Sequence, residues 1–160
     1  MIQGTVIVVV DDATLRRRIQ WALEGEGYGV LAFPSAEAFV PCVEEIERIE
    51  GAHCAVFEIR LPGRSGLQLQ DQLLGRQSSM PIVFLADRAD VALAIEGVRR
   101  GAFNFVEKPI NEERLLTVAA GALALHADQA SERQATAALR TRLDSLTVRE
   151  RQVLDLVLEG

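Results

Sequence analysis

Short apolar runs alternate with longer amphipathic stretches along roughly the first 125 residues of the chain. The runs are rich in Val, Ile and Phe and end at turn residues or acids, which is typical of strands buried in a parallel sheet. We expect such strands over residues 5–10, 28–33, 52–59, 81–86 and 102–106. Apolar residues at helical spacing predict helices over residues 14–24, 36–50, 66–74 and 89–100, and a last helix from residue 111 onward.

Strands that alternate with helices pair in parallel through right-handed crossovers. The pattern therefore predicts an α/β fold of the (βα)5 type, in which a doubly wound, five-stranded parallel sheet of order 2-1-3-4-5 carries helices on both faces. We assign residues 1–125 to this domain. Residues 126–145 contain many Ala, Gln, Glu and Arg residues but no Pro or Gly, so we expect them to extend the last helix as an exposed linker.

The linker also carries an incomplete heptad pattern. Val118, Leu125, Leu139 and Leu146 hold heptad spacing, but Glu132 interrupts it. A sustained coiled coil needs more regular apolar positions, so a partial dimer seam and a solvated helix are the two alternatives, and we favour the solvated helix. Residues 146–160 begin a further helix, because Thr147 and Glu150 form a capping-box pattern.

Composition narrows the class of protein. The net charge of −6 argues against a general nucleic-acid-binding or anionic-membrane-binding surface. No apolar run approaches the roughly 20 residues that span a bilayer, so we expect no membrane partner. The two cysteines, Cys42 and Cys54, fit a reducing compartment, and we expect a cytoplasmic protein.

Several charged residues follow the predicted strands directly. Asp11 and Asp12 end the first strand, Glu58 lies at the end of the third, and Lys108 follows the fifth. In a sheet of order 2-1-3-4-5 the three acids converge at one edge, where ligands of parallel sheets bind. Such carboxylates repel one another unless a cation compensates their charge. Two cations are candidates for this role, Mg2+ and the Lys108 ammonium. Glu58 alone could equally be a solvated acid at a strand end.

Three segments of the chain resemble parts of the receiver domain of two-component response regulators. They are Asp11-Asp12, the stretch from Ile59 to Gly66 (Ile-Arg-Leu-Pro-Gly-Arg-Ser-Gly), and Glu107-Lys108-Pro109. The resemblance covers about residues 4–125. The segment from Leu146 to Leu154 resembles the first helix of a LuxR-type helix-turn-helix, and the combination is similar to the FixJ/NarL group of transcriptional regulators. The match stops within that module, so we expect a truncated helix-turn-helix and DNA binding only by a full-length protein.

The resemblance assigns roles to individual residues. It implies that Asp11 and Asp12 form the acid pair that holds Mg2+, with Asp12, Glu58 and the Arg60 carbonyl as metal ligands. It also implies that Lys108 pairs with the phosphoryl group and that Phe105 is the aromatic switch. Two positions depart from the family: Glu58 replaces the phosphate-accepting Asp, and Ala86 replaces the switch Ser or Thr.

These departures lead to a functional prediction. Glutamate is one methylene longer than aspartate, so its carboxylate reaches about 1.5 Å farther, while Mg2+ accepts little deviation from ligand distances of about 2.0–2.1 Å. We expect a standing Glu58–Lys108 ion pair and impaired or bypassed phosphorylation in a non-enzymatic receiver that controls transcription through dimerisation. Two alternatives remain: a receiver competent for phosphorylation, and an inert interaction module.

The resemblance also implies partners. The input is a sensor histidine kinase or another regulatory protein. The output is a homodimer through the fourth helix and fifth strand, on a face that we assign to Val91, Ile95, Arg99 and Asn104. By spacing alone, Val91, Ile95 and Val98 form a helical stripe that we expect to face the core.

Overall fold

The computed structural model describes residues 4–144 and contains the predicted five-stranded parallel sheet. The strands are β1 (Thr5–Val9), β2 (Gly29–Phe33), β3 (His53–Glu58), β6 (Ile82–Ala86) and β7 (Asn104–Glu107). Their order, β2-β1-β3-β6-β7, is the predicted 2-1-3-4-5 order. Arg60–Leu61 (β4) and Arg64–Ser65 (β5) add a small antiparallel ladder after β3.

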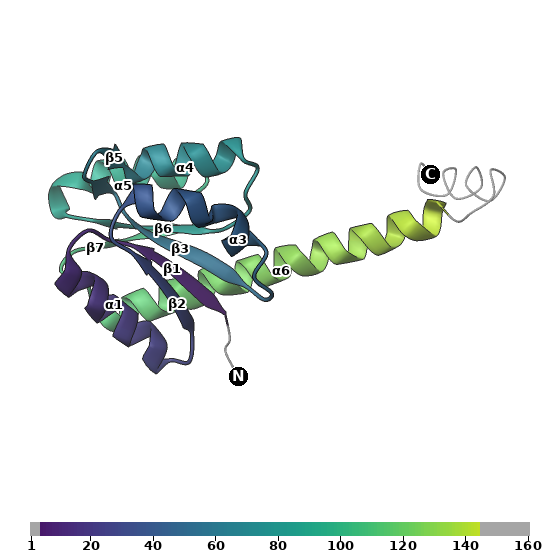
Figure 1. Ribbon diagram of the computed structural model, residues 1–160, viewed down its shortest axis with the longest axis horizontal. Helices are drawn as coiled ribbons and strands as arrows, with labels where there is room; N and C mark the ends of the chain where they lie inside the picture. The colour runs from purple at the N-terminus through teal and green to yellow at the C-terminus, as the bar shows by residue number, and fades with distance from the viewer. Residues whose placement is uncertain (1–3, 145–160) are drawn as a thin grey trace. The chain divides into compact units, whose positions relative to one another are not determined.

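Helices cover both faces of the sheet. They are α1 (Ala13–Gly25), α2 (Ala36–Phe39), α3 (Val43–Glu47), α4 (Gly66–Gly75), α5 (Val91–Arg99) and α6 (Glu112–Asp144), with 3-10 turns η1 (Val40–Cys42) and η2 (Arg88–Asp90). Figure 1 shows α1 and the first part of α6 on one face, and α3, α4 and α5 on the other.

The alternation of side chains along β1 explains this sandwich. Ile7 and Val9 belong to the apolar cluster under α3, α4 and α5, while Val6 and Val8 belong to the cluster under α1 and α6. All four are completely buried, because successive residues of a strand point to opposite faces and both faces are covered. The sequence therefore reads as a continuous apolar run.

Two helix predictions need correction. The single helix expected over residues 36–50 is divided into α2, η1 and α3. Pro41 lies in η1, and its missing N–H and its ring interrupt a regular α-helix at that point. In α5, Ala94 and Gly97 are the buried residues, whereas Ile95 is 41% exposed, so the expected inward stripe of Val91, Ile95 and Val98 is wrong for Ile95.

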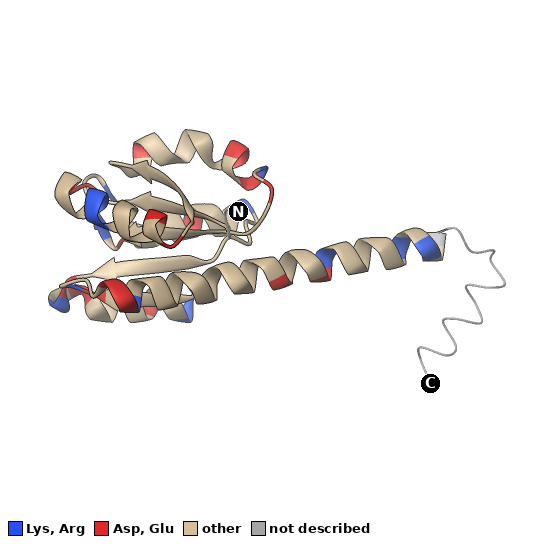
Figure 2. Ribbon diagram, turned by 90° about the horizontal axis from the view of Figure 1, so that it is seen from below, with Lys and Arg blue, Asp and Glu red and all other residues tan. Residues whose placement is uncertain are grey.

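The chain divides into two compact units at Ala127 and Asp128, and α6 contributes to both. The predicted heptad seam is not continuous, because Val118 is buried in the sheet's core while Leu125 and Leu139 are exposed. Charged residues of both signs occur along the later part of α6 (Figure 2). The helix-turn-helix prediction for residues 146–160 lies outside the described residues. Within residues 4–144, no helix is both long enough and apolar enough to cross a membrane.

Close packing between α5 and the sheet depends on Gly97. A Cβ atom at this position would lie 2.4 Å from Cε2 of Phe84, a fully buried ring of β6. The Gly97 carbonyl accepts a hydrogen bond of 2.7 Å from Nε2 of Gln70, which is buried in α4. These contacts fix α5 against both the sheet and the neighbouring helix.

We expect Gly97→Ala to destabilise the fold by about 1–3 kcal/mol, because the added methyl overpacks against Phe84. Urea denaturation followed by circular dichroism measures the effect. Gly75→Ala is the matched control, because a Cβ there meets nothing within 4 Å at the end of α4. Equal stabilities of the two variants would contradict this account of the packing.

A buried histidine pair joins the start of β3 to α6. The rings of His53 and His126 lie 4.1 Å apart between centroids, and the His53 N–H donates to Nδ1 of His126 at 3.0 Å. Burial lowers the pKa of His53 from its ordinary value, although a hydrogen bond with the Gly51 backbone and the charge of Glu47 oppose this shift.

The direction of this shift predicts how stability depends on pH. The unfolded chain takes up a proton at His53 near its ordinary pKa of about 6.5, whereas the folded chain resists protonation until a lower pH. The free energy of unfolding should therefore fall as pH decreases from 7 through 6. Denaturation at a series of pH values should show a shallower slope for His53→Gln, and identical slopes would contradict the assignment.

Candidate functional site

The candidate site lies at the carboxyl ends of the central strands. Glu58 is the last residue of β3, a strand whose every residue is buried, and Glu58 itself is only 5% exposed. Glu58 pairs with Leu85 of β6. The residue before it, Phe57, pairs with Val9 of β1. The parallel register thus holds a carboxylate where β1, β3 and β6 end together.

Lys108 forms an ion pair with this carboxylate. Its ammonium contacts Oε1 of Glu58, and the side chains are 22% and 6% exposed. Lys108 follows β7 directly, precedes a cis bond to Pro109, and its backbone N–H donates to the Ala86 carbonyl at 2.8 Å. Glu58 Oε2 is buried without a hydrogen-bond partner in residues 4–144, so Lys108 is the principal compensation for its charge.

The electrostatic surroundings of Lys108 include the acid pair. Burial lowers the pKa of the Lys108 ammonium, and the negative charges of Asp11 and Asp12 oppose that shift. Both acids therefore lie near enough for their charges to act on Lys108. The site contains three carboxylates and one ammonium, with a single direct ion pair between Glu58 and Lys108.

Asp11 and Asp12 differ in their contacts. Asp12 is the N-cap of α1, where Oδ1 accepts a hydrogen bond of 3.0 Å from the Leu15 N–H. Asp11 is exposed, and its carbonyl accepts a bond of 3.2 Å from Nη1 of Arg16, which also donates to the Val10 carbonyl at 2.8 Å. Arg16 thus ties the end of β1 to the first turns of α1.

Two of the Mg2+ ligands that the resemblance implies, Asp12 and Glu58, already have other partners in this arrangement. The ion requires near-octahedral oxygen ligands at about 2.0–2.1 Å. Asp12 is used as a helix cap and Glu58 is paired with Lys108. Across residues 4–144, no group of three or more His, Cys, Asp or Glu side chains is arranged to hold a metal ion.

The loop after Glu58 is held closely to the strand end. A Cβ at Gly66 would lie 2.7 Å from the Glu58 carbonyl oxygen, so glycine is needed for α4 to begin there. The Gly66 N–H donates to the Ile59 carbonyl at 2.8 Å, and Ser65 and Gln68 form a reciprocal capping box. The backbone that follows the carboxylate therefore has a fixed path.

The two predicted switch positions lie on adjacent strands. Ala86 ends β6, is completely buried, and pairs in register with Glu107 of β7. Phe105 is half-buried and packs against the apolar cluster that contains Ala86. A methyl group at position 86 can neither donate nor accept a hydrogen bond, so Ala86 contributes packing alone.

Sequence reasoning missed a second ion pair near the site. The Arg60 guanidinium donates to both carboxylate oxygens of Asp90, from Nε at 3.0 Å and from Nη2 at 2.8 Å. The sequence analysis placed Asp90 inside the helix expected over residues 89–100, which gave no reason to look for a distant partner. The two residues are separated by 30 positions and become neighbours because β3 and β6 are adjacent.

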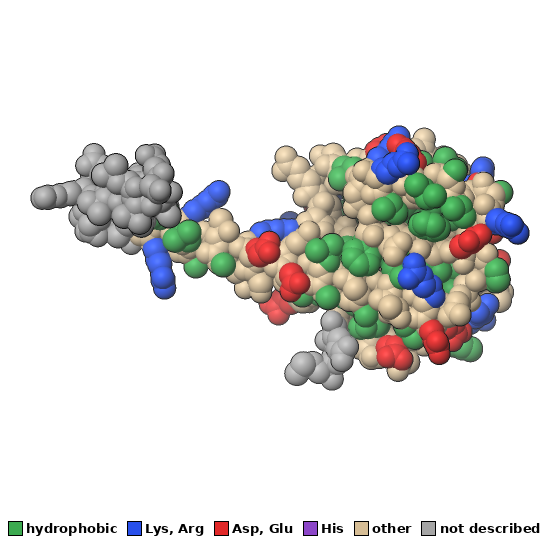
Figure 3. Space-filling model, turned by 180° about the vertical axis from the view of Figure 1, so that it is seen from behind, with side chains coloured by type: hydrophobic (Ala, Val, Ile, Leu, Met, Phe, Trp, Pro, Cys, Tyr) green, Lys and Arg blue, Asp and Glu red, His purple; other side chains and the backbone are tan. Residues whose placement is uncertain are grey.

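The predicted dimer face is partly exposed. Ile95 is 41% exposed, Arg99 is exposed, and Val91 and Asn104 are half-buried. Leu93, which the sequence analysis did not include, is 40% exposed on the same helix. Figure 3 shows hydrophobic side chains gathered on the side where α5 lies, with charged side chains around them.

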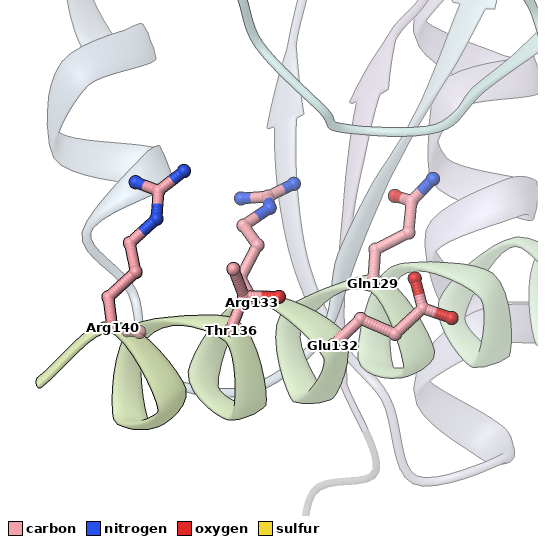
Figure 4. Close-up of a pocket in the computed structure, with 6 residues that line it drawn as sticks. Gln129, Glu132, Arg133, Thr136 and Arg140 are labelled. Atoms are coloured by element: carbon pink, nitrogen blue, oxygen red, sulfur yellow. The ribbon is translucent and has the colours of Figure 1, made fainter. Parts of the chain in front are cut away.

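A separate surface pocket runs along α6 in the second unit. Figure 4 shows the lining side chains, with Gln129, Arg133 and Arg140 extending to one side of the helix. Glu132, Thr136 and Ala137 are the other described residues that line it. The pocket has mixed charge and includes none of the predicted site residues.

Comparisons with known proteins find a matching family and several similar proteins. The profile of the response regulator receiver domain matches residues 6–120. The transcriptional regulatory protein FixJ of Bradyrhizobium diazoefficiens is 33% identical over 159 residues, which are 99% of this chain and 75% of that protein. The transcriptional regulatory protein TdiR of Thauera aromatica is 35% identical over 157 residues, covering 98% of this chain and 67% of that protein.

Solved structures agree with the fold. The response regulator StyR superposes with a TM-score of 0.83 at 35% identity, covering 99% of this chain and 78% of that one. Full-length FixJ from B. japonicum superposes with a TM-score of 0.75 at 31% identity, covering 100% of this chain and 77% of that one.

Removal of the Lys108 ammonium should show how much the buried Glu58 carboxylate, left without its partner, lowers the free energy of unfolding. We expect Lys108→Met to lower the free energy of unfolding by roughly 2–4 kcal/mol, because the Glu58 carboxylate loses its ionic partner. Arg88→Met, which removes an exposed charge, is the control and should have little effect. In the double variant with Glu58→Gln most of the loss should disappear. Urea denaturation of the variants tests this, and an undiminished loss in the double variant would contradict it.

Proposed function

Because the chain belongs to the response regulator receiver family, we propose that it is an atypical receiver that controls transcription through dimerisation, with phosphorylation impaired or bypassed. The observation that carries the proposal is the ion pair between Glu58 and Lys108 at the end of β3. The names of relatives such as FixJ and TdiR, which are transcriptional regulatory proteins, support the output.

The chemistry of Glu58 supports impaired phosphorylation. Transfer of a phosphoryl group requires the attacking oxygen in line with the leaving group, and displacement by about 1 Å costs a large factor in rate. The extra methylene moves the carboxylate toward Lys108, which holds Oε1. The acid is therefore already bound to the cation that would otherwise pair with an incoming phosphoryl group.

The residues around Ala86 support a bypassed switch. A hydroxyl at this position would be able to bind a phosphoryl group and draw the following loop toward the site, whereas a methyl group cannot. Phe105 consequently has no polar connection to the site through Ala86. We infer that the input reaches the receiver through a protein contact, from a sensor histidine kinase or another regulatory protein.

The surface of α5 and β7 supports dimerisation. Leu93 and Ile95 expose apolar area, and Arg99 supplies charge beside them. A face of this mixed character suits a modest, reversible interface. We assign the homodimer to this face together with Val91 and Asn104.

Intact mass and light scattering with Mg2+ and a small phosphodonor test the proposal. We expect wild type to gain no phosphate and to keep its oligomeric state when the phosphodonor is added. Glu58→Asp should restore modification if the longer side chain is the cause of the block. Glu58→Gln is the matched control, because it keeps the length of Glu58 but cannot pair ionically with Lys108.

A wild-type chain that gains one phosphate and then dimerises would overturn the proposal in favour of a phosphorylation-competent receiver. Glu58→Asp and Glu58→Gln variants with the oligomeric state of wild type under all conditions would instead favour an inert interaction module. A change of oligomeric state in Glu58→Gln without phosphate would support control by the ion pair.

A further inference from the structure

Arg60 and Asp90 form a bidentate ion pair between the segment that follows β3 and the turn that precedes α5. Arg60 lies two positions after Glu58, in the short strand β4, and Asp90 immediately precedes α5. Both nitrogen–oxygen bonds are short, 3.0 Å and 2.8 Å, and each carboxylate oxygen accepts one. Bidentate pairs of this kind define orientation as well as distance.

The two partners differ strongly in burial. The Asp90 side chain is 6% exposed, whereas the Arg60 side chain is 72% exposed. An exposed arginine that merely meets an exposed acid contributes little to stability. Here a buried carboxylate has both oxygens satisfied by one guanidinium, so it is Asp90 that depends on the contact.

Asp90 does not perform the local role that its position suggests. It occupies the N-cap position of α5, where an aspartate ordinarily accepts a hydrogen bond from the second or third N–H of the helix. Its side chain caps no N–H of α5. The Asp90 backbone, with φ −108° and ψ 7°, lies outside the usual extended region of an N-cap, and Asp90 is also the last residue of the turn η2. The carboxylate is instead bound by the Arg60 guanidinium, in the segment that follows Glu58.

The backbone on each side of the pair is fixed. The Ile59 N–H donates to the Leu85 carbonyl at 2.9 Å, which ties the start of the Arg60 loop to β6. The Asp90 N–H donates to the Asp87 carbonyl at 2.8 Å, which closes the turn before α5. Leu93 and Ile95, the exposed apolar residues of α5, follow within two turns of helix.

We propose that the Arg60–Asp90 ion pair is a latch that transmits the state of the Glu58 site to the start of α5. The effect of the latch on dimerisation rests on the proposed function, because it needs the proposed dimer face. The connection from the Glu58 site to the start of α5 does not need that face. The Arg60 guanidinium also holds the pKa of the Asp90 carboxyl below its usual value, which favours the ionised form that the pair requires. Arg60 and Asp90 are thus positioning residues.

Hydrogen exchange measured by mass spectrometry on the full chain tests the link directly. Amides of residues 88–95 should exchange roughly three- to tenfold faster in Arg60→Ala than in wild type, because the start of α5 loses its attachment. Asp90→Asn should act in the same direction, and Arg60→Lys should fall between, since an ammonium cannot form the fork. Arg88→Ala is the matched control, an exposed arginine two residues from Asp90, and should leave exchange unchanged.

Transmission requires coupling between the two sites, which a double-mutant comparison measures. Glu58→Gln should alter exchange at residues 88–95 in the wild-type background but cause no further change in the Arg60→Ala background. An equal effect of Glu58→Gln in both backgrounds, no effect in either, or an Arg60→Ala effect no larger than that of Arg88→Ala would overturn the latch.

The exchange readout separates this proposal from the proposed function. Samples are compared at a protein concentration where light scattering shows one species, so exchange does not depend on dimerisation or on phosphate. Phosphorylation of wild type would overturn the proposal of an atypical receiver. The exchange rates would still test the latch in that case. Unchanged exchange in Arg60→Ala would overturn the latch while leaving the Glu58 chemistry standing.

Discussion

A carboxylate buried at the end of a central strand must have a compensating charge, and much of this site depends on that constraint. Every residue of β3 is buried, and the strand ends in Glu58. The cation comes from a different strand, β7, whose following residue Lys108 is placed by a backbone bond to Ala86. The order of the sheet therefore determines the chemistry, because β6 alone separates β3 from β7 and the ends of these parallel strands meet at one edge of the sheet.

Strand positions and sheet order could be predicted because two-sided burial leaves a clear apolar signal, as in β1, where all five residues except Thr5 are fully buried. Convergence of Glu58 with Lys108 then follows from topology. The division at Pro41 was missed because apolar spacing continues across it, as Val43 and Ile46 are both buried. The Arg60–Asp90 pair was missed because side-chain contacts between loops leave no periodic pattern in sequence.

Exposure along α5 illustrates a further limit of periodicity. Spacing identifies an apolar stripe but does not say which of two apolar edges faces inward. In α5 small residues form the inward side, since Gly97 allows Phe84 to approach and Ala94 is completely buried. Ile95 and Leu93 therefore remain at the surface. Tight packing by small residues thus makes larger apolar residues available for contacts with a partner.

Asp12 connects the acidic site to the stability of a helix. Its carboxylate caps α1 at the Leu15 N–H while its charge acts on Lys108. Truncation to alanine would therefore remove a site charge and a cap worth about 0.5–2 kcal/mol at the same time. Asparagine keeps an oxygen for the cap and removes only the charge. Asparagine is consequently the substitution that separates the electrostatics of the site from the folding of its first helix.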